Sequence, residues 1–127
     1  MDKPTLVESD YKGGEALVRD LDRTGVRVEA AFWLFLPEPN EWRLHLALAD
    51  VVDKGPKKAY EIIQDRLDQL HLEGLSLRNI SLITPDDNMV KLLRLAIRTG
   101  PGVKGIRFTG NVINNVLIED AYIYRVA

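Results

Sequence analysis

Three glycines at positions 100, 102 and 105, in the stretch TGPGVKGIRFTGN (residues 99–111), have the spacing G-x-G-x-x-G. In dinucleotide-binding proteins this spacing cradles a phosphate, provided that the glycines follow a strand and open a helix whose N-terminus meets the ligand. Here they follow a predicted helix and precede a predicted strand, so a phosphate would meet helix carbonyl groups, where the dipole has the wrong sign. The sequence therefore favours a helix stop and a tight turn over a nucleotide site.

Carboxylates follow two predicted strands, with Asp50 and Asp53 after residues 42–50 and Asp86 and Asp87 after residues 79–84. The carboxyl ends of strands are the usual ligand sites in α/β sheets, and several carboxylates together can hold Mg²⁺. One hypothesis is therefore metal-assisted phosphoester hydrolysis. The alternative is structural, because acidic residues suit the first turn of a helix. We favour the structural interpretation and predict no metal site and no cofactor.

The remaining titratable residues give weaker signals. His45 and His71 are far apart in the sequence, and neither has a partner at a metal-binding spacing. Lys91, Arg94 and Arg98 form a basic stripe on a predicted helix. Such a stripe could grip phosphate, but it is more often the solvated face of a buried helix. We expect no nucleic-acid partner.

The last two predicted strands, 105–113 and 116–126, flank Asn114-Asn115, a pair that favours a tight hairpin turn. This register predicts opposed residues whose numbers sum to 229. One face then carries polar and tyrosine side chains, which could bind a polar ligand or a protein partner or could be an ordinary solvated sheet face. The candidate ligand or partner residues in this hairpin are Arg107, Asn111, Glu119, Asp120 and Tyr122.

Glu119 belongs to the opposite, apolar face of the predicted hairpin. That face also carries Ile106, Phe108, Val112, Leu117, Ala121 and Ile123 and is predicted to be core. An ionised carboxylate in a core is costly unless it is paired. Glu119 is therefore either buried beside a partner, or it lies at the rim of the sheet and reaches water.

The patterning predicts one domain over residues 1–127 with the order α-β-β-α-β-α-β-β. The expected helices cover about 10–23, 55–71 and 85–98, and the expected strands cover 27–36, 42–50, 79–84, 105–113 and 116–126. The fold class is α/β or α+β, with a single mixed sheet of about five strands and three helices.

Composition narrows the class of protein. The 127 residues are 46% hydrophobic and 28% charged, as in an ordinary globular domain. The net charge of −2 gives no global attraction for nucleic acid or anionic lipid. There is no cysteine, which mildly favours a reducing compartment, and the longest apolar run, AAFWLFLP, is too short to cross a bilayer. We expect a cytoplasmic protein with no membrane partner.

One apolar surface predicts self-association. Ala31, Trp33 and Phe35 share a face of the strand 27–36 that would normally be half solvated, and Ala47 and Ala49 make the neighbouring strand shallow. Because large exposed apolar patches are uncommon on monomers, either a helix or a second subunit must cover this face. The sequence predicts a homodimer on this ground.

The segments GIRFTGN and IEDAYIYR of the C-terminal hairpin, with EAAFWLFLPEPNEWRLHLALADVVDKGPKKAYEII before them, give the chain a resemblance. It resembles small stand-alone bacterial proteins that are uncharacterised, which implies a bacterial source and no activity, cofactor or catalytic residue. The leading functional hypothesis is a small, non-catalytic accessory or interaction module that acts as a homodimer, with an unknown protein partner possible. The alternative is the metal-assisted phosphoester hydrolase.

Overall fold

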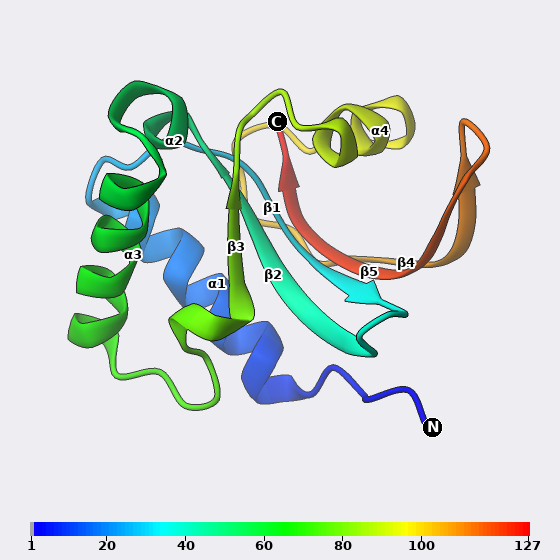
Figure 1. Cartoon of the computed structure of the whole chain (residues 1–127), viewed down its shortest axis with the longest axis horizontal. Coiled ribbons are helices and arrows are strands. Elements are labelled where there is room, and N and C mark those ends of the chain that lie inside the picture. The colour runs from blue at the N-terminus through cyan, green and yellow to red at the C-terminus, as the bar shows by residue number, and fades with distance from the viewer. Residues whose placement is uncertain (1) are drawn as a thin grey trace.

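A computed structural model describes residues 2–127 and contains one five-stranded mixed sheet with helices on both faces (Figure 1). The strand order is β3-β2-β1-β5-β4; β2 and β3 run parallel, and every other neighbouring pair is antiparallel. The strands are β1 (Val28–Leu36), β2 (Glu41–Leu48), β3 (Ile80–Ile83), β4 (Ile106–Ile113) and β5 (Val116–Val126). The helices are α1 (Glu8–Arg23), α2 (Ala49–Lys54), α3 (Pro56–Leu70), α4 (Asn88–Ala96) and the short 3₁₀ helix η1 (Leu77–Asn79).

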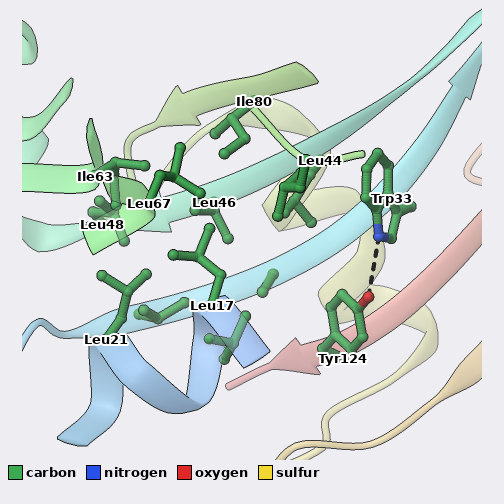
Figure 2. Packing of buried hydrophobic residues seen from close by; sticks show 14 of the residues in the cluster. Leu17, Leu21, Trp33, Leu44, Leu46, Leu48, Ile63, Leu67, Ile80 and Tyr124 are labelled. Atoms are coloured by element: carbon green, nitrogen blue, oxygen red, sulfur yellow. Dashed lines mark hydrogen bonds between the residues drawn. The ribbon is translucent and has the colours of Figure 1, made fainter. Parts of the chain in front are cut away.

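Helices α1 and α3 cover one face of the sheet and form the larger core (Figure 2). Leu17 and Leu21 lie one helical turn apart on α1, and Ile63 lies on α3. Each helix turns one apolar stripe toward the strands. Against these helices pack alternate side chains of β1 and β2: Ala31, Trp33, Phe35, Trp42, Leu44, Leu46 and Leu48. This face is covered by the chain's own helices.

Helix α4 covers part of the opposite face and forms the second core. Its Val90 and Leu93 pack on Phe32, Ala121 and Ile123 of the central strands. The N-cap of α4 is Asp87, whose carboxylate accepts a hydrogen bond from the Met89 amide at 2.9 Å. Thr84, which precedes the predicted helix 85–98, is not the cap, and its hydroxyl donates to Asp86 instead.

The predicted hairpin register is confirmed. Residues of β4 and β5 pair so that their numbers sum to 229, from Ile106 opposite Ile123 to Ile113 opposite Val116. Asn114 and Asn115 both have positive φ, at 49° and 66°, as a two-residue turn of this kind requires. The local chemistry of the turn therefore fixes which residues face one another over the whole hairpin.

The fold class predicted from the sequence, a mixed five-stranded sheet with helices, is confirmed. The helix count differs, because α2 forms where the second strand was expected to continue to residue 50. Gly55, with a φ of +87°, separates α2 from α3, and Pro56 opens α3 at its first position, where its missing N–H costs nothing.

The structure bears on two expectations about which surfaces are covered. Trp33 pairs with Leu44 rather than lying beside the small residues Ala47 and Ala49, and the helix-covered core buries it, so this face does not call for a second subunit. At the hairpin tip, the expected core residues Val112 and Leu117 are exposed, because β4 and β5 run on beyond the part of the sheet that α4 covers (Figure 1).

Candidate functional site

The glycine segment between α4 and β4 serves the chain's own geometry. Gly100 has a φ of +72°, a conformation that other residues rarely adopt. The carbonyl of Gly102 accepts a hydrogen bond from the Arg125 guanidinium at 3.2 Å. A Cβ at Gly105 would collide with the ring of Tyr122. Gly100 and Gly105 therefore have a structural reason to be glycine, and the segment follows the C-terminus of α4, as the sequence indicated.

The strand-end carboxylates do not assemble into a site. Asp50 lies 3.8 Å from the ammonium of Lys54, and Asp87 caps α4. The hydroxyl of Thr84 donates to Asp86 at 2.6 Å and lowers the pKa of that carboxyl. Across residues 2–127, no group of three or more acidic or histidine side chains is placed to hold a metal ion. No observation here supports the phosphoester hydrolase.

The structure brings together three of the five candidate residues of the hairpin. Arg107 donates two hydrogen bonds to the Asp120 carboxylate, at 2.5 and 2.7 Å. Tyr122 of β5 is the residue directly opposite Arg107 of β4. The Asp120 side chain is only 3% exposed. Asn111 is exposed nearer the tip, and Glu119 is half-buried opposite Gly110. A ligand-binding role for this set stays a prediction.

The N-terminal segment covers that carboxylate. Lys3 donates to Asp120 at 2.6 Å, and its ammonium stands 5.0 Å from the centroid of the Phe35 ring. The segment is held down by a hydrogen bond from the indole of Trp42 to the carbonyl of Pro4, at 2.8 Å. Asp120 is therefore part of an internal ion-pair cluster. No sequence signal points to Lys3, because it lies 117 residues away along the chain.

Electrostatics within this cluster favour the ionised acid. Burial raises the pKa of Asp120, but the hydrogen bonds from Arg107 and Lys3 outweigh that effect and leave the pKa below its ordinary value. Arg107 also donates to the Tyr11 hydroxyl at 3.1 Å. These contacts join β4, β5 and the start of α1, so the cluster fastens the hairpin to α1 and to the N-terminal segment.

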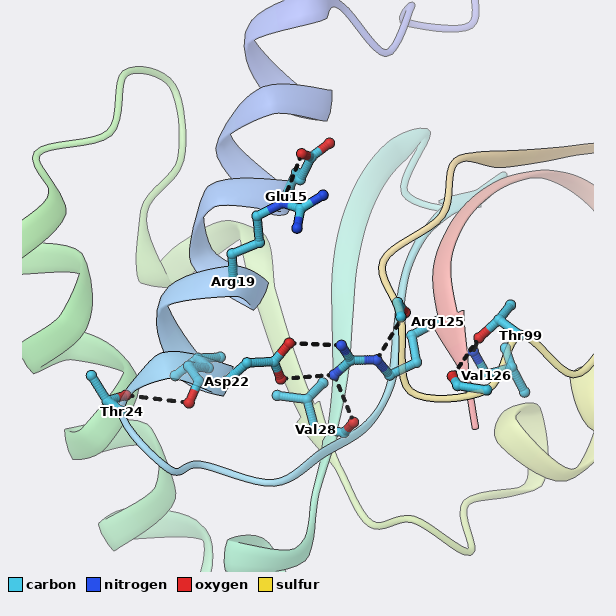
Figure 3. A network of polar contacts seen from close by, with 11 residues as sticks. Glu15, Arg19, Asp22, Thr24, Val28, Thr99, Arg125 and Val126 are labelled. Atoms are coloured by element: carbon cyan, nitrogen blue, oxygen red, sulfur yellow. Dashed lines mark hydrogen bonds and ion pairs between the residues drawn. The ribbon is translucent and has the colours of Figure 1, made fainter.

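Two further ion-pair groups tie the other elements together. Asp20 of α1 accepts hydrogen bonds from Arg66 of α3 at 2.6 and 3.1 Å, and those bonds lower the pKa of Asp20 despite its burial. Asp22 receives two bonds from the buried Arg125 of β5, which also donates to the carbonyl of Val28 (Figure 3). Among residues 2–127 no buried side-chain nitrogen or oxygen lacks a hydrogen-bond partner, and both groups serve as cross-links between elements.

Of the predicted basic stripe only Lys91 and Arg94 lie on α4, because the helix ends at Ala96, before Arg98. Arg94 donates to the carbonyl of Ala127 at 3.0 Å and to that of Pro85 at 3.3 Å, so it anchors the last strand to the loop before α4. Lys91 is exposed. His45 stacks on Phe32 with ring centroids 5.2 Å apart, and burial lowers its pKa. None of these side chains joins a cluster with catalytic geometry.

A concave surface lies between α4 and the hairpin. A groove of about 410 Å³ is lined by Asn88, Met89, Lys91, Leu92, Leu95, Asn114 and Val116. A neighbouring hollow of about 230 Å³ shares Met89 and extends to Leu34, Leu36, Leu117 and Glu119. In Figure 1 the hairpin curls away from the plane of the sheet toward the side that carries α4. We call these residues together the α4–hairpin groove.

Exposed apolar side chains concentrate around this groove. Residues 2–127 contain six strongly exposed large apolar side chains. Four of them lie on α4 or the hairpin: Leu95, Val112, Val116 and Leu117. Sequence reasoning missed this surface, since it assigned Val112 and Leu117 to the core. The groove has the apolar lining and polar rim of a binding surface, and it carries no catalytic constellation.

Comparison of the chain with family models, curated proteins and solved structures found no match. The helices formed by residues 2–127 are all too short or too polar to pass through a bilayer.

Proposed function

We propose that the chain is a non-catalytic interaction module and that two copies associate through the α4–hairpin groove. The observation that carries the proposal is the gathering of Leu95, Val112, Val116 and Leu117 on one side of the molecule. Exposed apolar surface of this kind is costly in water and marks sites of protein association. The lack of cysteine supports the cytoplasm as the compartment in which the module works.

A second copy fits this surface because the chain supplies both halves of the contact. The groove is concave and apolar, and the hairpin tip beside it carries the protruding Val112 and Leu117. A twofold axis brings the same patch of each copy together, so tip and groove can meet reciprocally. The rim charges are also opposite in sign, with Lys91 on α4 and Glu119 on β5. A net charge of −2 per copy opposes association only weakly.

The test is the mass of the protein in solution, measured by size-exclusion chromatography with light scattering at tens of micromolar. The wild-type chain is expected to be a dimer, and Leu95→Asp is expected to be a folded monomer whose melting temperature, unlike that of the dimer, does not depend on protein concentration. Val52→Asp is the matched control, because Val52 is 64% exposed and Leu95 68% exposed, both on helices, but Val52 lies on α2 outside the groove. A monomeric wild type, or a Leu95→Asp variant that stays dimeric, would refute the proposal.

A further inference from the structure

The two outer edges of the sheet are built differently. At one edge, β3 has only four residues, and the outward amide of Leu82 donates to the hydroxyl of Tyr60 on α3 at 3.1 Å. The guanidinium of Arg43 also binds the carbonyl of Ile80 at 3.1 Å. Short length and side-chain covering are the usual means by which proteins block the edge of a sheet. This edge is therefore closed to another strand.

The other edge has none of these protections. Strand β4 has eight residues, and within residues 2–127 its backbone forms hydrogen bonds with β5 alone. Its sequence, IRFTGNVI, contains one charged residue, Arg107, and that side chain is drawn onto Asp120. No lysine or proline guards the strand, although these are the residues that most often prevent edge pairing. The outer backbone groups of β4 are free to pair with another strand.

We propose that β4 of one copy pairs antiparallel with β4 of a second copy across a twofold axis, so that two five-stranded sheets join into one of ten strands. This inference rests on the proposed homodimer and names the backbone contact that forms it. The exposed edge and the exposed apolar tip belong to the same hairpin. Edge pairing therefore supplies main-chain hydrogen bonds beside the apolar contact, as in strand-addition interfaces generally.

Antiparallel pairing also accounts for where the apolar residues lie. The tip of one hairpin then meets the beginning of the partner's β4, which follows α4 in the sequence. Val112 and Leu117, opposite each other near the tip, are in this way brought beside the first residues of the partner's β4, where Ile106 and Phe108 are only partly buried. A twofold axis repeats the contact at both ends of the seam, so each copy buries its tip once.

Disulfide cross-linking tests the pairing directly, because the chain has no cysteine of its own. Single cysteines are placed along β4 at Ile106, Phe108, Thr109, Asn111, Val112 and Ile113, leaving out Gly110 for its positive φ. In a twofold antiparallel pair, only residues at or beside the axis face their own copies closely enough to form a disulfide. Covalent dimer should therefore peak at one point of β4 and fall off on both sides. Asp53→Cys on α2 is the control that should not cross-link.

Hydrogen exchange gives a second readout that needs no substitution in β4. Outward amides of β4 are expected to be protected in the wild-type dimer and to exchange rapidly in Leu95→Asp, while the Leu82 amide is the same in both. A wild-type dimer with unprotected β4 amides and no cross-linking in β4 would overturn the edge pairing and leave the proposed homodimer standing. A wild-type monomer would overturn both.

Discussion

Gly14 of α1 lies directly against the phenol ring of Tyr124 on β5: a Cβ at residue 14 would come within 2.9 Å of two ring carbons. Tyr124 cannot move aside easily, because its hydroxyl accepts from the indole of Trp33 at 3.0 Å and donates to the carbonyl of Tyr11 at 2.6 Å (Figure 2). Burial raises the pKa of this hydroxyl, so it stays a protonated donor. The missing side chain of Gly14 therefore sets how closely α1 approaches the sheet.

Gly14→Ala is expected to lower the free energy of unfolding by about 1–3 kcal/mol, the usual cost of overpacking a rigid core. Helix propensity alone predicts the opposite sign, a gain of up to about 1 kcal/mol. Gly13→Ala is the matched control, because its Cβ would meet Leu75 at an ordinary 3.6 Å, and it should stabilise α1. Urea denaturation of both variants measures the difference, and equal effects would contradict the close packing of Gly14 and Tyr124.

The C-terminal hairpin shows what local sequence can predict. Asn114 and Asn115 tolerate positive φ, and a two-residue turn leaves one possible register, so every cross-strand pair follows from those two residues. The alternation of the strands also gave the correct face for Phe108 and Ile123. Whether a face is covered is a different question. Val112 lies on the predicted apolar face but beyond the reach of α4, and no local pattern reports how far a helix extends over a sheet.

The ion-pair cluster shows what local sequence cannot predict. The alternation places the carboxylate of Glu119 on the predicted apolar face, whereas Asp120 is the buried carboxylate and Glu119 is half-exposed. The outcome depends on Lys3 and Tyr11, which only the tertiary fold brings to β4 and β5. Similarly, α2 continues the apolar pattern of β2, and period-two alternation over a few residues does not distinguish a strand from the first turn of a helix.

Asp120→Asn is expected to lower the free energy of unfolding by about 2–3 kcal/mol, because it leaves Arg107 and Lys3 without their anion. The cost of stranding one partner of a fully buried pair is larger, about 3–5 kcal/mol, but these two cations are partly exposed and regain water. Thermal and urea denaturation measure the loss. Glu119→Gln, one residue away, should stay within about 0.5 kcal/mol of wild type, and a similar loss in both variants would refute the assignment.

Tyr60→Phe is expected to cost about 0.5–1.5 kcal/mol, the net contribution of one hydrogen bond, because the outward amide of Leu82 loses its acceptor. The more specific result is local: exchange of the Leu82 amide should accelerate relative to that of other β3 amides. Native-state hydrogen exchange measures this, and an unchanged Leu82 rate would show that Tyr60 does not protect the β3 edge.

The dependence of stability on pH should show two descents on acidification. Burial lowers the pKa of His45 in the folded protein, while the unfolded chain binds the proton near pH 6.5. Between those two values the unfolded state holds more protons, so stability falls as the pH drops through that window.

Asp20 and Asp120 act in a lower window, because their folded pKa values lie below the unfolded value of about 3.9. Their contribution to stability is present above that value and is lost below it. His45→Gln should remove only the upper descent and Asp120→Asn should shrink only the lower one, as followed by melting temperature from pH 7.5 to pH 2.5. A His45→Gln variant that keeps the upper descent would show that another group titrates there.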